Sequence, residues 1–208
     1  MQESSASLTS ESASTLVLFD FDGTITRKDS LFDFIKYYWG AMAFYWGMFR
    51  LSPILIVFKL GFIPNWKAKE RVLTYFFRHE PVKKFQQRCD EYARQRLPHI
   101  VKDSAIRKIR EFQQQGADIY LVSASAENWL QAWCESLGIH LLATRLEVKD
   151  GGLTGKIMGS NCHGPEKVAR IRCAIDVERY EKIYGYGDSK GDRDMLALAH
   201  FPHYRFFT

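Results

Sequence analysis

A short apolar run that ends in two carboxylates constrains the fold of this chain more than any other feature. Residues 16–19 read Leu-Val-Leu-Phe, and such uninterrupted apolar runs are typical of strands buried on both faces of a parallel sheet. Asp20 and Asp22 follow directly. Residues two apart in an extended chain point to the same side, so both carboxylates can face one spot at the strand's carboxyl end. Like charges at that separation repel each other, so fold stability alone does not explain why both acids stand there.

The pair of acids allows two interpretations. A strand can simply run into a polar turn, in which aspartate and Gly23 are ordinary loop residues. The alternative is a site for a divalent cation with a nucleophile beside it, because magnesium and calcium prefer hard oxygen ligands such as carboxylates. An isolated Asp-x-Asp-Gly sequence does not decide between them, so the other strand ends have to be considered.

Segments with strand character alternate with helical segments along most of the chain. This alternation predicts an α/β fold, a Rossmann-like parallel sheet with helices on both faces. Ligands of such sheets bind at the carboxyl ends of the strands. Strands are expected at 16–21, 117–125 and 203–207. A further strand is expected to begin near residue 139, and another in the first part of 181–199. A hairpin is expected at 145–157, and helices are expected at 103–116, 126–138, 164–175 and late in 181–199.

Residues 27–102 interrupt the alternation with aromatic and basic residues at mostly helical spacing. This pattern predicts a helical cap inserted after the first strand. Because proline disfavours helix interiors, about four helices are expected, separated by Pro53, Pro64, Pro81 and Pro98. The predicted organisation is a disordered polar tail at 1–14, a core of 15–26 and 103–208, and the cap at 27–102.

Polar side chains follow three further strands or begin the helices after them. Ser123 follows an apolar strand, and its hydroxyl with the next backbone N–H, that of Ala124, could hold a phosphate oxygen. Lys167 lies near a helix start, where the dipole disfavours a cation, although a surface lysine is the simpler interpretation. Asp188 and Asp192 lie in a glycine-flanked loop and suit either a turn with a helix N-cap or magnesium ligands.

In chain order these elements resemble the haloacid dehalogenase-like superfamily of phosphohydrolases. The resemblance rests on Asp-Phe-Asp-Gly-Thr-Ile-Thr at 20–26, Ser-Ala-Ser at 123–125, Lys167, and Gly-Asp-Ser-Lys-Gly-Asp at 187–192. The position of the cap is similar to that in subfamily IB, the branch with phosphoserine phosphatases. The resemblance implies a phosphatase that uses Mg²⁺ and an aspartyl-phosphate intermediate.

The resemblance also implies a role for each acid of the first motif. Asp20 would attack phosphorus, and Asp22 would protonate the leaving oxygen and later deprotonate the attacking water. Mg²⁺ would be bound by the Asp20 carboxylate, the Asp22 backbone carbonyl and Asp188. Such a cation would make the clustered carboxylates tolerable.

The remaining motif residues would bind phosphate. Ser123, Ala124 and Lys167 would hold the phosphoryl oxygens, and Asp192 would orient Lys167 or bind a metal-coordinated water. Asp22 favours a phosphatase or mutase, since transport ATPases carry threonine there and halide-cleaving members lack the acid. Mutases usually carry a different cap. Phosphate transfer to an acceptor other than water would use the same residues and stays an alternative.

The cap residues bear on the substrate. Phosphoserine phosphatases carry a glutamate shortly after the first motif, whereas this chain has Asp29 and Asp33 there and no glutamate until Glu70. Gly191 stands where those enzymes place asparagine. Residues 163–168 and the aromatic cap resemble phosphatidylglycerophosphatase C. Three substrate classes therefore stay open: a small phosphorylated metabolite, a lipid headgroup phosphate such as phosphatidylglycerophosphate, and phosphoserine.

Residues 31–64 form a long apolar stretch, and seven of the thirteen residues at 37–49 are aromatic. A membrane span needs about 20 apolar residues, and an arginine such as Arg50 near its centre costs about 3 kcal/mol. A transmembrane helix is therefore not predicted. The stretch is either the core of a soluble cap or an interfacial hairpin with aromatic side chains at headgroup level.

Charge and cysteine usage limit the partners. Between residues 59 and 111, fourteen lysines and arginines stand against six acids, which suits a solvated helix face, an anionic substrate or a membrane surface. No nucleic-acid-binding motif is recognisable, so no nucleic-acid partner is expected. Four widely spaced cysteines without a secretory signal predict a cytoplasmic protein, or one at the inner membrane surface. The sequence does not indicate an oligomeric state.

Overall fold

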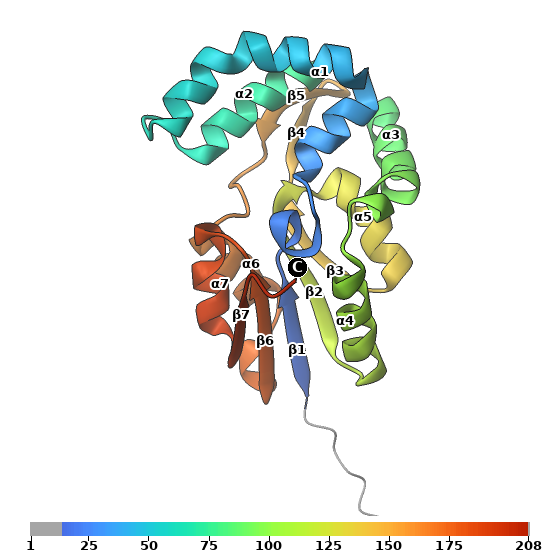
Figure 1. The fold of residues 1–208 in the computed structure, drawn as a ribbon, viewed down its shortest axis with the longest axis vertical. Helices are drawn as coiled ribbons and strands as arrows, with labels where there is room; N and C mark the ends of the chain where they lie inside the picture. Colours follow the sequence, from blue (N-terminus) through green and yellow to red (C-terminus); the bar gives the residue numbers. More distant parts are fainter. Residues whose placement is uncertain (1–13, 208) are drawn as a thin grey trace, which may run out of the picture.

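The computed structural model describes residues 14–207, whose main sheet is parallel and has five strands (Figure 1). The strands are β1 (Thr15–Phe19), β2 (Asp118–Ala126), β3 (His140–Thr144), β6 (Lys182–Gly187) and β7 (Phe201–Tyr204). Their order is β3-β2-β1-β6-β7, and each neighbouring pair is parallel. The predicted α/β class is therefore confirmed.

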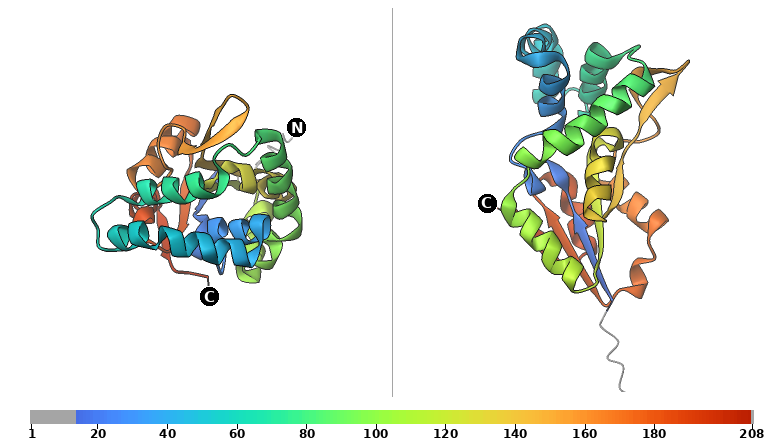
Figure 2. Two further views of the ribbon diagram at one scale, coloured as in Figure 1. Left: turned by 90° about the horizontal axis from the view of Figure 1, so that it is seen from above. Right: turned by 90° about the vertical axis from the view of Figure 1, so that its right-hand side faces the viewer.

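Four helices cover the sheet: α4 (Asp103–Gln114), α5 (Glu127–Leu137), α6 (Pro165–Ala174) and α7 (Arg193–Leu198). Side chains of β1 alternate between two hydrophobic cores. Val17 and Phe19 pack into the core beneath α4 and α5, whereas Leu16 and Leu18 pack into the core beneath α6 and α7. The right-hand view of Figure 2 shows α4 and α6 on opposite sides of the sheet. Burial on both faces explains why β1 reads as a continuous apolar run.

The parallel register brings the ends of β1 and β6 together. Phe19, the last residue of β1, pairs with Tyr186, and the Asp20 backbone N–H donates to the Tyr186 carbonyl at 2.9 Å. The predicted strand end at residue 21 is two residues too late, because the chain turns through Phe21–Ile25. Asp20 and Asp22 are thus not consecutive same-side residues of one strand.

The cap segment contains α1 (Ser30–Lys59), α2 (Asn65–Phe77) and α3 (Val82–Gln95). The prediction that Pro53 separates two helices is wrong, because Pro53 lies inside α1. The Phe49 carbonyl, which proline cannot satisfy, accepts from the Ser52 hydroxyl at 2.7 Å. The regular helix is instead interrupted at Gly40, whose φ of 83° glycine adopts without strain.

The other three prolines lie at helix boundaries, as predicted. Pro64 and Pro81 directly precede α2 and α3, and Pro98 lies in the 3₁₀ turn Leu97–His99. The structure therefore has three α-helices and one short 3₁₀ turn in place of four full helices.

The predicted hairpin is present as β4 (Leu146–Lys149) and β5 (Gly152–Ile157), which form a separate two-stranded sheet. It packs against α2, where a Cβ at Gly155 would lie only 2.3 Å from Thr74 Cα. A hairpin assigned to the core by sequence thus lies against a cap helix, and the division into core and cap stays a prediction.

Both ends of the chain differ from the predictions. The last strand, β7, begins two residues before the predicted segment at 203–207. The predicted tail at 1–14 lies outside the described residues except for Ser14. The Ser14 carbonyl accepts from Glu181 N at 3.0 Å, which places that residue beside the start of β6.

Candidate active site

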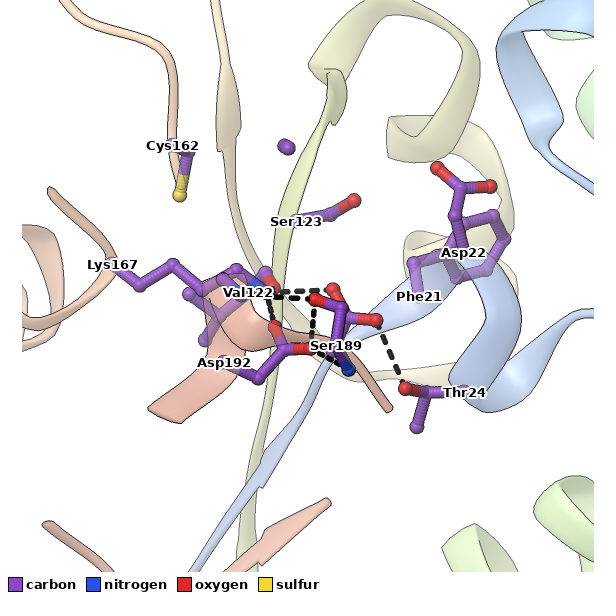
Figure 3. A network of polar contacts seen from close by, with 12 residues as sticks. Phe21, Asp22, Thr24, Val122, Ser123, Cys162, Lys167, Ser189 and Asp192 are labelled. Atoms are coloured by element: carbon purple, nitrogen blue, oxygen red, sulfur yellow. Dashed lines mark hydrogen bonds and ion pairs between the residues drawn. The ribbon is translucent and has the colours of Figure 1, made fainter. Parts of the chain in front are cut away.

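Lys167 lies at the centre of a polar cluster at the carboxyl ends of β1, β2 and β6 (Figure 3). Its Nζ donates to Asp20 Oδ1 at 2.6 Å, to Asp192 Oδ1 at 2.7 Å and to the Val122 carbonyl at 2.6 Å. These acceptors use all three ammonium protons. Burial opposes the charge, yet the two carboxylates raise the pKa of Lys167 above its ordinary value. A buried ammonium thereby fixes the positions of two acids.

The loop after β6 holds Asp192 in place. Asp192 Oδ2 accepts from Ser189 N at 2.9 Å, from Ser189 Oγ at 2.7 Å and from Asp188 N at 3.2 Å. Burial would raise the pKa of Asp192, but the ion pair with Lys167 holds it below its ordinary value. The Asp192 carboxylate therefore orients Lys167 toward Asp20.

Asp20 and Asp188 flank the hydroxyl of Thr24, which lies 2.9 Å from Asp20 Oδ2 and 3.3 Å from Asp188 Oδ1. Burial raises the pKa of Asp20 to about 6, although Lys167 opposes the shift. Burial, followed by the charge of Asp192, also raises the pKa of Asp188. Three carboxylates against one ammonium leave an excess of negative charge.

The geometry of the acids suits a divalent cation. Each of Asp20, Asp188 and Asp192 offers a carboxylate oxygen, and these oxygens lie within 4.8 Å of one another. Gly23 brings the first-motif turn against Asp188, since a Cβ at Gly23 would lie 2.3 Å from Asp188 Oδ2. The donors are all hard oxygen atoms, which Mg²⁺ and Ca²⁺ prefer.

The Asp22 carboxylate lies outside this cluster, and Figure 3 shows it directed away from Lys167 and Asp192. Its Oδ1 accepts from Ser30 N at 2.7 Å, and its Oδ2 accepts from the hydroxyls of Ser30 and Ser125. Burial raises the pKa of Asp22 to about 7, so this carboxyl can hold or release a proton near neutral pH. The two acids of the first motif therefore have different environments.

Ser123 and Ala124 lie at the end of β2, as expected. Ser123 is buried and its hydroxyl accepts from Ser125 N at 3.0 Å. The Ala124 carbonyl accepts from Lys69 Nζ at 2.8 Å, and Lys69 also donates to Asn161 Oδ1 at 3.1 Å. A cap lysine is thus hydrogen-bonded to the loop expected to bind phosphate.

Sequence reasoning missed the residues that α1, α2 and the 158–164 segment contribute. Ser30 holds Asp22 and Lys69 contacts the β2 loop, but no local pattern distinguishes them from ordinary helix residues. Thr24 and Ser125, which donates to Asp22, could have been found, because they belong to the first and second motifs. At Gly191 a Cβ would lie 2.3 Å from His163 Nε2, so glycine leaves room for this imidazole.

A cavity of about 640 Å³ opens beside His163 and Asn161. Its walls come from the start of α2, the 158–164 segment and the ends of β5 and α6 beside it, and they include Trp66, Glu70 and Ser160. The clustered acids do not line it. Lys69 lies between the cavity and the strand end, since it donates hydrogen bonds to Asn161 on the cavity wall and to Ala124 at the end of β2.

Comparisons with known proteins are consistent with this geometry. The model of the haloacid dehalogenase-like hydrolase family matches residues 17–197. Protein CicA of Caulobacter vibrioides is 34% identical over 194 residues, which span 92% of this chain and 86% of CicA. A probable phosphatase of Mycobacterium tuberculosis is 39% identical over 89 residues, 41% of this chain and 31% of that protein.

Solved structures show the same fold. A phosphoserine phosphatase with an analogue of its phospho-aspartyl intermediate has a TM-score of 0.59 and 24% identity, covering 90% of this chain and 84% of that one. The matched family segment includes Asp20, Lys167 and Asp192. The predicted enzyme class, a phosphatase, is thereby confirmed, and the chain belongs to the haloacid dehalogenase-like hydrolase family.

Proposed function

We propose that this chain is a magnesium-dependent phosphomonoester hydrolase that forms an aspartyl-phosphate on Asp20. The observation that carries the proposal is the buried ammonium of Lys167 between Asp20 and Asp192, with Asp188 close by. A phosphate monoester brings further negative charge to a site already rich in carboxylates. A second cation beside Lys167 would offset that charge.

The residues present fit Mg²⁺. The Asp20 carboxylate, the Asp188 carboxylate and the Asp22 backbone carbonyl would hold the ion, and all three are hard oxygen donors. When bound, Mg²⁺ supplies charge neutralisation for the nucleophile and the phosphate. Asp192 already accepts from Lys167 and Ser189, so its proposed role is to position Lys167.

In the first step, one Asp20 carboxylate oxygen attacks phosphorus. The new O–P bond forms while the bond between phosphorus and the ester oxygen breaks, and Asp22 transfers its proton to the leaving oxygen. The pKa of about 7 and the hydrogen bonds from Ser30 and Ser125 support this role for Asp22.

In the second step, water attacks the phosphorus of the aspartyl-phosphate and gives a proton to Asp22. The bond between Asp20 and phosphorus breaks, which releases inorganic phosphate and restores the carboxylate. Ser123, the Ala124 N–H and Lys167 would hold the non-bridging oxygens as charge builds on them.

We infer that neither Asp29 nor Asp33 binds an amino group of the substrate, because both acids already have partners. Asp33 is buried and forms an ion pair with Arg96 at 3.0 Å, and Asp29 Oδ1 accepts from Phe32 N at 3.1 Å at the start of α1. This disfavours phosphoserine. A small phosphorylated metabolite or a lipid headgroup phosphate, such as phosphatidylglycerophosphate, is the proposed substrate class.

A comparison of esters tests both parts of the proposal. Phosphate release would be measured with Mg²⁺ from phosphatidylglycerophosphate in micelles, glycerol 3-phosphate and O-phosphoserine, with and without a chelator. We expect one of the first two to be hydrolysed about tenfold or more faster than O-phosphoserine, and the chelator to abolish release.

Each other outcome has a separate meaning. A preference for O-phosphoserine would overturn the inference about the substrate. Lack of turnover of every ester, a generic aryl phosphate included, would overturn the hydrolase itself. If phosphorylated glycerol accumulated in place of free phosphate when glycerol was added, the reaction would be a transfer to an alcohol acceptor.

A further inference from the structure

Large apolar side chains on α1 and the turn after it point into solvent. Six of them are exposed by 60% to 87%, and we call them the apolar face: Met42, Tyr45, Trp46, Phe49, Leu60 and Phe62. The first four recur at intervals of three, one and three residues, which places them on one side of a helix. An exposed apolar stripe of this length marks an interaction site, because single scattered residues would not align.

The opposite side of the same helix is occupied. Phe44 and Gly47 are buried, and a Cβ at Gly47 would lie 2.3 Å from the Phe76 ring of α2. This contact holds residues 41–59 against α2, so the apolar face turns outward. Figures 1 and 2 show this part of α1 at the outer end of the molecule, across α2 from the β4–β5 hairpin. A helix that is apolar on both sides requires a partner for its second side.

The charges around the apolar face have one sign. From residue 34 to residue 69 the chain carries five lysines and arginines and no acid. Arg50, Lys59 and Lys67 are exposed, at the middle and end of α1 and the start of α2. Each cation near an anionic bilayer adds electrostatic attraction, and tryptophan and tyrosine favour the headgroup region. The partner is therefore expected to be apolar and anionic at once.

A second copy of this chain fits these charges poorly. A twofold interface brings the same patch of both subunits together, so the acid-free cationic surface would meet itself. Like charges directly opposite each other are destabilising at an interface. A bilayer that contains anionic phospholipid supplies both the apolar layer and the opposite charge.

The helix is built to lie on the bilayer and not to cross it. By length and composition α1 could span a membrane, and only 11% of its most apolar window is buried. However, the break at Gly40 leaves residues 41–59 with Arg50 at their centre, where insertion is unfavourable. The ion pair of Asp33 with Arg96 anchors the preceding turns to α3, which prevents α1 from leaving the cap.

We propose that the apolar face binds the surface of a membrane rich in anionic phospholipid, with residues 41–59 lying in the plane of the interface. Trp66, which follows the α1–α2 turn, also lines the cavity beside His163 and Asn161. A docked molecule would thus hold the mouth of that cavity near the headgroups. The proposal concerns binding and does not require that the chain hydrolyses any ester.

Flotation of the full chain with lipid vesicles tests the proposal. One set of vesicles would contain phosphatidylcholine alone, and the other phosphatidylcholine with phosphatidylglycerol in equal parts. We expect the chain to float with the anionic vesicles and the double variant Phe49→Ser/Phe62→Ser to bind about tenfold or more weakly, since two inserted rings are lost. The variant Arg50→Gln/Lys59→Gln should lose the preference for phosphatidylglycerol.

Phe201→Ser is the matched control, because Phe201 is 44% exposed on β7 and lies outside the apolar face. A far-UV circular dichroism spectrum unchanged from that of the wild type would show that the fold of each variant is intact. Absence of flotation, or equal flotation of the wild type and the Phe49→Ser/Phe62→Ser variant, would overturn the proposal. The proposal would also be overturned if the wild type were a dimer in solution and this double variant were a monomer.

Discussion

The strand-end cluster around Lys167 and the apolar face of α1 depart from ordinary burial in opposite directions. In the first, a lysine is 1% exposed and has three hydrogen-bond acceptors within 2.7 Å. In the second, Met42 is 87% exposed and Phe62 is 77% exposed. The buried charges satisfy one another inside the fold, whereas the side chains of the apolar face lie mostly in solvent. The first arrangement is therefore explained by chemistry within the chain, and the second by something outside it.

The largest effect is expected from Lys167→Met, which breaks the cluster. Asp20 and Asp192 would remain buried without a counter-charge, so we expect a loss of about 3–5 kcal/mol in the free energy of unfolding. Turnover should fall about 10³-fold or more, because the phosphoryl oxygens lose their cation. Urea unfolding and aryl phosphate hydrolysis would measure the two effects. A stable variant with near-normal turnover would show that the ammonium is not essential.

Gly23→Ala sharpens the comparison by adding one methyl group beside Asp188. The new Cβ would lie 2.3 Å from Asp188 Oδ2, so we expect turnover to fall about 10- to 100-fold and more Mg²⁺ to be needed. Gly61→Ala is the control, since Gly61 has the same φ of 84° and nothing within 4 Å. If both variants lost activity equally, backbone strain and not the contact with Asp188 would be responsible.

The smallest effect is expected from Phe49→Ala, which is compared with Phe44→Ala on the other side of α1. Phe44→Ala removes a buried ring and should lower the free energy of unfolding by about 3 kcal/mol. Phe49→Ala removes an exposed ring of the same helix, and the change should stay within about 0.5 kcal/mol. Thermal or urea unfolding would measure both. An equal loss in both variants would mean that the apolar face packs within the protein.

Sequence patterns were sufficient to bring the motifs to one sheet edge, although β1 ends two residues earlier than predicted. The β1 run, the serine after β2 and the acids after β6 could be placed on one sheet edge through the rule for parallel strands. The contacts of Lys69 and His163 could not be predicted, since they depend on how α2 and the 158–164 segment fold over that edge. The same limit applied to Pro53 inside α1, where the Ser52 hydroxyl donates to the carbonyl of Phe49 that proline leaves without a donor.

The sequence also could not show which side of α1 is buried and which is exposed. An apolar stretch from residue 31 to residue 64 fits a cap core and an interfacial hairpin equally well. Only the burial of Phe44 and the packing of Gly47 against α2 show which side is covered. The helix turns out to serve partly as core, while its other side stays open.

The most direct test of the account is to look for phosphate on Asp20 itself. Turnover of an aryl phosphate with Mg²⁺ would be stopped with acid, and the mass of the peptide that contains Asp20 would be measured. The account predicts a species heavier by one phosphoryl group, absent from Asp20→Asn, which should be folded but inactive. Steady phosphate release without this species, or substantial turnover by Asp20→Asn, would contradict the covalent mechanism.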